Sequence, residues 1–147
     1  MLRTITYNAS LRGSSRLFLR TLSSTAPKIY DFNQIKQLVQ KPVESKILVD
    51  VREPKELEAY KMPTAINIPL KTAPGALGLP AEEFKDVFHF NKPATDKELI
   101  FFCAHGIRAK TAEELARSYG YENTGTYPGS ISEWLEKGGA EIVPSKK

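Results

Sequence analysis

One stretch of the sequence decides the fold: Glu98-Leu-Ile-Phe-Phe-Cys103-Ala-His-Gly-Ile-Arg108, continuing into Ala109-Lys-Thr-Ala-Glu-Glu-Leu-Ala-Arg117. Its apolar run over 99–102 is typical of a strand buried on both faces of a parallel sheet. From Ala109 the apolar residues return at helical spacing among good helix formers. A tight turn joins the two and begins with the only cysteine of the chain. Because ligands bind at the carboxyl edge of open α/β sheets, this turn is the first candidate site.

The position of Cys103 favours a thiolate. The first N–H groups of a helix lack partners within the helix, and its dipole places partial positive charge at that end. Amides of the turn 104–108 can converge on an anion, and Gly106 allows a positive φ and close approach of the backbone. Arg108 adds a full positive charge. The sequence therefore predicts a nucleophilic sulfur in a loop that also binds an anion.

Three further segments accompany this loop: Ile47-Leu-Val-Asp50-Val-Arg52-Glu53, Ala65-Ile-Asn-Ile-Pro69-Leu70, and Tyr127-Pro-Gly129-Ser-Ile-Ser-Glu-Trp134 with Gly138-Gly139. Together with the six-residue loop Cys103-Ala-His-Gly-Ile-Arg108 they resemble the rhodanese family over roughly 28–143. The resemblance implies an α/β fold, a single rhodanese-like domain with a parallel sheet of about five strands and helices on both faces. It also implies a sulfurtransferase that carries sulfur as a persulfide on Cys103.

Alternating strand and helix patterns along the chain predict the same parallel sheet. We expect strands at 28–30, 47–51, 65–68, 99–102 and 123–127, and a loop at 71–80. Asp31 is a suitable N-cap for a helix that ends at Lys41-Pro42, and Pro54 opens a short helix. Residues 81–88 suit an amphipathic helix with Phe84, Val87 and Phe88 inward. The helix after the loop should end near Gly120, and Ser130 should cap a last helix that Gly138-Gly139 ends.

The first residues of the chain have a different composition. Residues 1–30 contain five of the 21 Lys and Arg residues and no acidic residue, so the remainder has 16 basic and 17 acidic side chains. Arg12, Arg16 and Arg20 share one face of a helix, in a Ser-rich, acid-free segment. This pattern predicts that 1–25 is a mitochondrial transit peptide, cleaved near Ser23 to Ala26, and that the domain works in the matrix.

Because the basic charge belongs to the leader, the domain itself offers no argument for nucleic acid binding. No uncharged apolar run is long enough to span a membrane. We expect a monomer that acts on small molecules. With a single cysteine no internal disulfide forms, so a persulfide on Cys103 must be relieved by an external nucleophile.

The loop residues receive separate roles. Amides of Ala104, His105, Gly106 and Ile107 are expected to hold the charged sulfur, as an oxyanion hole holds oxygen. Arg108 is a cation at the amino end of a helix, where it opposes the dipole, so binding an anionic substrate would explain its presence. His105 either contacts a substrate oxygen or is an exposed turn residue, and both interpretations stay open.

Residues near the loop receive structural roles first. Asp50 and Arg52 lie at the same sheet edge as Cys103, and we expect Asp50 to brace the loop. Arg52 either braces it or contacts substrate. Trp134 is expected in the core or the pocket wall, with a backbone partner for its indole N–H.

The expected reaction is a two-step sulfur transfer without an organic cofactor or metal. The resemblance implies thiosulfate as donor and a thiol such as glutathione, or cyanide, as acceptor. One cysteine and two distant histidines provide no zinc ligand set, and nucleotide-binding and serine hydrolase motifs are absent.

Two other functions remain open. One is a sulfur carrier or persulfide relay that serves a partner protein. The other is a cysteine phosphatase or arsenate reductase. The loops of cysteine phosphatases have five residues between the cysteine and the arginine, whereas this loop has four. They also have a histidine before the cysteine, where this chain has Phe102.

The chain also departs from the family pattern. Many members read Gly-His-Ile-Pro-Gly-Ala where this chain has Ala59-Tyr-Lys-Met62-Pro63-Thr64-Ala65, and Ser130 replaces a second glycine after Gly129. Both changes affect turns near the site, and so the shape of the pocket.

Overall fold

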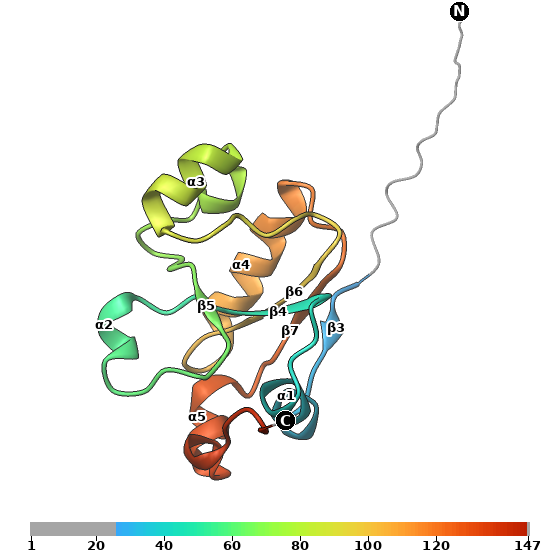
Figure 1. The fold of residues 1–147 in the computed structure, drawn as a ribbon, viewed down its shortest axis with the longest axis vertical. Coiled ribbons are helices and arrows are strands. Elements are labelled where there is room, and N and C mark those ends of the chain that lie inside the picture. Colours follow the sequence, from blue (N-terminus) through green and yellow to red (C-terminus); the bar gives the residue numbers. More distant parts are fainter. Residues whose placement is uncertain (1–25, 147) are drawn as a thin grey trace, which may run out of the picture.

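The computed structural model describes residues 26–146 and contains one five-stranded sheet. The strands are all parallel and lie in the order β3-β7-β6-β4-β5 (Figure 1). Their bounds are β3 Lys28–Ile29, β4 Lys46–Asp50, β5 Ile66–Asn67, β6 Glu98–Phe102 and β7 Thr124–Thr126. This confirms the predicted parallel sheet. The predicted transit peptide, residues 1–25, lies outside the described part of the chain.

Helices cover both faces of the sheet, as predicted (Figure 1). On one face lie α1 (Phe32–Gln40) and α5 (Ser130–Glu136), and on the other α3 (Ala81–Phe88) and α4 (Ile107–Ser118). The short α2 (Pro54–Leu57) follows β4, and two 3-10 turns lie at η1 (Ala76–Gly78) and η2 (Gly139–Glu141). Within residues 26–146 no helix combines the length and apolar character needed to cross a bilayer.

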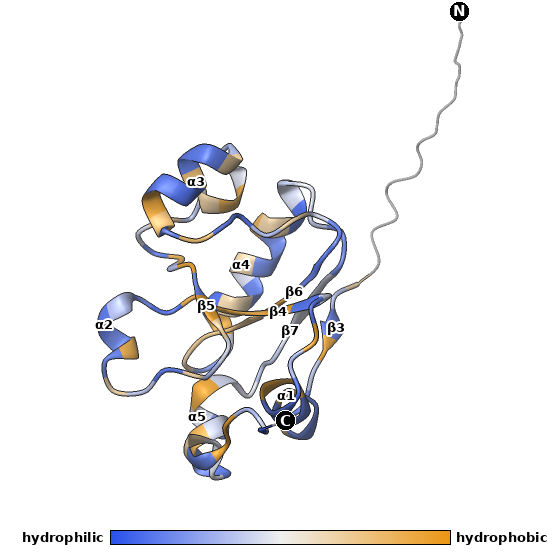
Figure 2. Cartoon of the chain, viewed as in Figure 1, coloured by the Kyte–Doolittle hydropathy of each residue, from blue (hydrophilic) through white to orange (hydrophobic). Residues whose placement is uncertain are grey.

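The central strand β6 organises both cores. All five of its residues are buried, and it pairs with β4 on one side and β7 on the other. Because side chains alternate along a strand, Leu99 and Phe101 pack toward α3 and α4, whereas Ile100 and Phe102 pack toward α1 and α5. The apolar residues of this strand lie in the middle of the ribbon in Figure 2, between the helical layers.

Local sequence signals explain several helix boundaries. The Asp31 side chain accepts a hydrogen bond from the Gln34 amide, and the Gln34 side chain accepts one from the Asp31 amide. This reciprocal pair satisfies two amides that the helix cannot, so α1 begins where predicted. Pro54 occupies the first turn of α2, and Gly120, with φ +98°, follows the end of α4.

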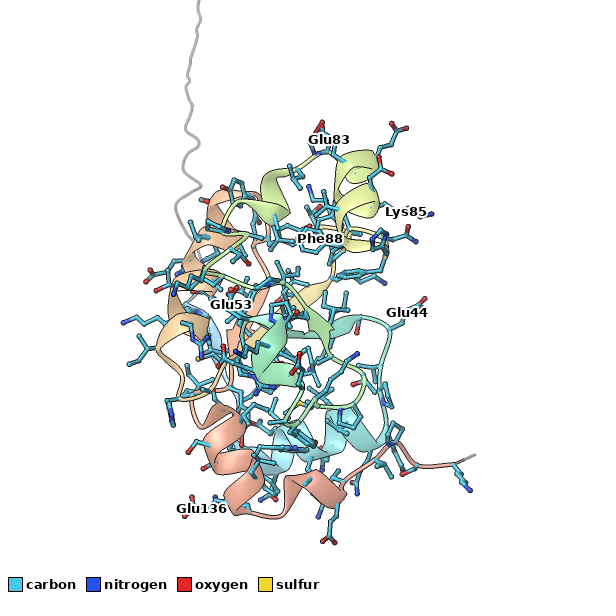
Figure 3. All side chains as sticks on the ribbon, turned by 90° about the vertical axis from the view of Figure 1, so that its left-hand side faces the viewer. Glu44, Glu53, Glu83, Lys85, Phe88 and Glu136 are labelled. Atoms are coloured by element: carbon cyan, nitrogen blue, oxygen red, sulfur yellow. The ribbon has the colours of Figure 1, made fainter. Side chains whose placement is uncertain are left out.

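Three local predictions are wrong. Val87 is 60% exposed, because α3 turns only Phe84 and part of Phe88 toward the core; Figure 3 shows Glu83 and Lys85 on the outer side of the same helix. The predicted loop 71–80 includes the turn η1, which buries Leu77. Ser130 is the first residue of α5 rather than its N-cap, and its hydroxyl bonds elsewhere.

Candidate active site

Cys103 follows β6 directly, and α4 begins four residues later at Ile107, two residues before the predicted Ala109. The Gly106 amide donates a hydrogen bond to Cys103 Sγ over 2.9 Å. Cys103 is only 1% exposed, whereas His105 and Ile107 of the same loop are exposed, Ile107 by 80%. The sulfur is therefore enclosed by a loop whose rim faces solvent, and one loop amide already points at it.

The turn requires a glycine at position 106. Gly106 has φ +101°, a conformation that side chains with a Cβ rarely adopt. A Cβ at this position would lie 2.6 Å from the carbonyl oxygen of Pro128. The prediction of a positive φ is confirmed. The close approach of the Pro128 carbonyl is a second reason why glycine is required here.

Backbone groups of α5 hold the loop from the opposite side. The Ile131 amide donates to the Cys103 carbonyl, and the Ser132 amide donates to the Ala104 carbonyl, each over 3.0 Å. Because these two carbonyls point toward α5, the peptide groups of the turn are oriented by contacts that lie outside the loop. The sequence pattern of the loop alone could not reveal this support.

Ser130 contacts Cys103 from the same side. Its hydroxyl accepts a hydrogen bond from the Cys103 amide at 3.1 Å and lies 4.0 Å from Cys103 Sγ. Its backbone has φ +55°, which is unusual for a serine. Sequence reasoning gave this serine a capping role and missed the contact. The available signal was the serine itself, which directly follows Gly129 in the segment 127–134.

Arg108 forms an ion pair with Glu56 of α2. Its two terminal nitrogens donate to the two carboxylate oxygens of Glu56 over 2.8 and 2.9 Å. Both side chains are about one-third exposed. The guanidinium lowers the pKa of Glu56 to about 2, and hydrogen bonding to Glu56 raises the pKa of Arg108. The arginine predicted to bind an anion thus already shares its charge with a carboxylate that sequence reasoning missed.

Arg52 lies in a buried pair with Asp50. The Arg52 guanidinium donates to the Asp50 carboxylate, with a shortest distance of 2.8 Å, and to the Tyr60 carbonyl at 2.9 Å. The Asp50 carboxylate also accepts from the Arg52 amide at 3.0 Å. Both residues are nearly fully buried. These contacts brace the chain that follows β4, and they engage the N–H donors of the Arg52 side chain within the protein. The expectation that Asp50 braces the loop after Cys103 stays a prediction, since these hydrogen bonds all lie within residues 50–60.

Trp134 is fully buried in the core on the α1 and α5 face, as predicted. Its indole N–H donates to the Tyr60 hydroxyl at 2.9 Å, so the predicted backbone partner is wrong. Tyr60 links α5 to the segment after α2, beside the carbonyl that binds Arg52. Within residues 26–146 no group of three or more His, Cys, Asp or Glu side chains could hold a metal ion.

Comparison with known proteins adds independent findings. A family model described as a rhodanese-like domain matches residues 31–137. The chain is 68% identical over 133 residues to "Thiosulfate sulfurtransferase RDL2, mitochondrial" of Saccharomyces cerevisiae, covering 90% of this chain and 89% of that protein. It is 42% identical over 113 residues to the "Thiosulfate:glutathione sulfurtransferase" of the same yeast, covering 77% of this chain and 81% of the relative. The crystal structure of the yeast RDL2 protein aligns with a TM-score of 0.81 and 69% identity, covering 83% of this chain and 99% of that one.

Proposed function

Because the chain belongs to the rhodanese family, we propose that it is a thiosulfate sulfurtransferase that transfers sulfur through a persulfide on Cys103. The observation that carries this proposal is the enclosed sulfur at the end of β6 with the Gly106 amide directed at it over 2.9 Å. Such a donor stabilises negative charge on sulfur, both in the thiolate and in the charge that develops during transfer.

The reaction proceeds in two displacements at sulfur. In the first, the Cys103 thiolate attacks the outer sulfur of thiosulfate, a new S–S bond forms, and sulfite leaves with the electron pair of the bond that breaks. In the second, an acceptor thiolate attacks the outer sulfur of the persulfide, and Cys103 leaves as a thiolate. In this proposal the amide of Gly106, which already donates to Cys103 Sγ, holds the charged sulfur together with the amides of Ala104, His105 and Ile107.

Arg108 binds the sulfonate end of the donor in this proposal. A guanidinium has five N–H donors, and the two hydrogen bonds to Glu56 leave the others for a substrate. Glu56 holds the arginine in one orientation, which lowers the entropic cost of binding an anion. His105, exposed on the rim, is a second donor within the loop. Arg52 acts indirectly, because its ion pair with Asp50 braces the chain that follows β4.

We further propose glutathione as the acceptor and the mitochondrial matrix as the place of action. The yeast relative named thiosulfate:glutathione sulfurtransferase supports glutathione, and the word mitochondrial in the name of RDL2 supports a mitochondrial location. The Arg-rich, acid-free sequence of 1–25 supports a transit peptide. The domain acts as a monomer on small molecules, with no nucleic acid or membrane partner.

A persulfide relay to a partner protein is the second candidate. Ile107 is 80% exposed on the rim of the loop, so a partner protein that approaches Cys103 would contact this side chain. Steady-state kinetics separate the two functions, because a relay would use free thiosulfate poorly and a partner persulfide well.

Intact mass spectrometry tests the main proposal. After incubation with thiosulfate, the full-length protein should gain one sulfur atom, which glutathione or cyanide removes. Cys103→Ser should show no gain. A gain only from other sulfur donors would favour the relay, and no gain from any donor would contradict both functions.

A further inference from the structure

We propose that the Ser130 hydroxyl is a positioning group for the reacting sulfur, donating a hydrogen bond to Cys103 Sγ when Cys103 is a thiolate. The contact is in place, with Ser130 Oγ 4.0 Å from Sγ and on the side of the loop that faces α5. The role deepens the proposed function, because it concerns the ease with which Cys103 leaves when the persulfide passes its sulfur on.

The hydrogen bonds around Ser130 leave its proton free to move. The hydroxyl donates to the Tyr127 carbonyl at 2.9 Å and accepts from the Cys103 amide at 3.1 Å. The Ser130 amide donates to the same Tyr127 carbonyl at 3.1 Å. When the hydroxyl turns its proton toward sulfur, the carbonyl therefore keeps a partner, so the change leaves no buried acceptor unsatisfied. A neutral thiol gains little when the Ser130 hydroxyl rotates toward it, whereas a thiolate gains a charge-assisted hydrogen bond.

The backbone at Ser130 supports the same conclusion. Ser130 is fully buried and has φ +55°, a conformation that glycine adopts at lower cost. A glycine at this position would relieve the strain but remove the hydroxyl. The serine thus occupies a strained site where its only added group contacts Cys103 at two atoms.

A hydrogen bond from Ser130 to Cys103 Sγ affects the two displacements at sulfur differently. In the persulfide the negative charge lies on the outer sulfur, and Sγ carries little of it. Charge returns to Sγ when the acceptor takes the outer sulfur. A hydrogen bond to Sγ therefore favours the free thiolate and the delivery step, because a stabilised thiolate is a better leaving group.

Alkylation of the full-length protein by iodoacetamide tests the role without relying on sulfur transfer, since the chain has one cysteine. Ser130→Gly and Ser130→Ala should each shift the pH midpoint of alkylation upward by about half a unit or more, the scale of one lost hydrogen bond to a charged group. Single-turnover transfer from the persulfide to glutathione should slow about threefold or more in both variants. Ser118→Ala is the control, since its exposed hydroxyl donates to the Leu115 carbonyl at the other end of α4.

The variants separate the hydroxyl from the backbone. Glycine removes the strain and alanine keeps it, so a shift shared by both reports the hydroxyl alone. The charged and titratable groups on the elements around Cys103 stay unchanged in both: His105, Arg108, Glu56, Asp50, Arg52 and Glu133. A Ser130→Gly protein with the wild-type alkylation midpoint overturns the role, whatever Ser130→Ala does. A shifted midpoint in a protein that takes no sulfur from thiosulfate would contradict the proposed function and leave the contact supported.

Discussion

At the scale of single residues, the site depends on backbone positions as much as on reactive side chains. Cys103 is the proposed nucleophile, but the direction of the loop around it depends on Gly106 and on the amides of Ile131 and Ser132. A substitution that changes no charge can therefore disable the site.

Gly106→Ala should show this directly. Alanine must either adopt φ near +101° or shift the loop, and its Cβ would lie 2.6 Å from the Pro128 carbonyl oxygen. We expect a loss of about 1–3 kcal/mol in the free energy of unfolding and loss of most sulfurtransferase activity. Urea denaturation and thiosulfate turnover measure the two effects. Gly120→Ala is the matched control, because that glycine also has a positive φ but nothing lies within 4 Å of its Cβ position. Equal loss of activity in both variants would contradict the explanation.

Glu56→Gln should change the pH dependence of stability. The pKa of Glu56 is lowered to about 2 from 4.5 by Arg108, so the carboxylate stabilises the folded state above about pH 4.5, and this contribution is lost as pH falls through 2. The variant should be less stable than wild type by about 1 kcal/mol at pH 6, as for a partly exposed pair, and the difference should shrink toward pH 2. Thermal unfolding from pH 6 to pH 2 measures it. A difference that grows on acidification would exclude the ion pair as its cause.

At the scale of elements, each helix is fixed by the face that it turns to the sheet. For the helix α3, the sequence pattern predicted the first and last residues correctly but not all the residues that face the core. Its bounds are those predicted, yet Phe84 is fully buried and Val87 is exposed. Phe84 packs against Phe88 and Phe90, with ring centroids 4.5 and 5.3 Å away, and this aromatic group sets the rotation of the helix.

A matched pair of truncations in α3 tests that orientation. Phe84→Ala should lower the free energy of unfolding by about 3–5 kcal/mol, because it leaves a cavity in the core. Val87→Ala should change it by no more than about 0.5 kcal/mol, as at other exposed positions. Chemical denaturation of both variants measures the contrast. Similar losses would mean that Val87 is buried in solution.

At the scale of the whole molecule, the charge and the fold belong to different parts of the chain. Residues 28–143 contain the sheet, both cores and the site, whereas the excess of basic charge lies within residues 1–30. Folding stability should therefore depend little on the leader.

Removal of residues 1–25 tests this separation. The shortened protein should unfold within about 2 °C of the full chain, since it keeps all the core residues of the described part, 26–146. It should sediment as a monomer and retain thiosulfate turnover, but isolated mitochondria should no longer import it. Import of the shortened protein would contradict the transit-peptide proposal, and a large drop in melting temperature would contradict the separation of leader and fold.

The sequence by itself determined the strands and the α-helices and their order, although not the 3-10 turn η1. The apolar run of β6, the helical spacing after it, and the signals at Asp31, Pro54 and Gly120 all depend on neighbours along the chain, so local patterns sufficed. The same is true of the turn after Cys103, because a strand, a glycine and a helix start lie within a few residues.

Only the tertiary structure decided which distant groups meet at that turn. Glu56 is 52 residues from Arg108, and Ser130 is 27 residues from Cys103. Trp134 and Tyr60 are 74 residues apart. Such pairs form because parallel strands bring their carboxyl ends to one edge, and no local pattern encodes which side chains face each other there. The sequence therefore predicted the nucleophile, and the fold decided which distant groups contact the turn that contains it.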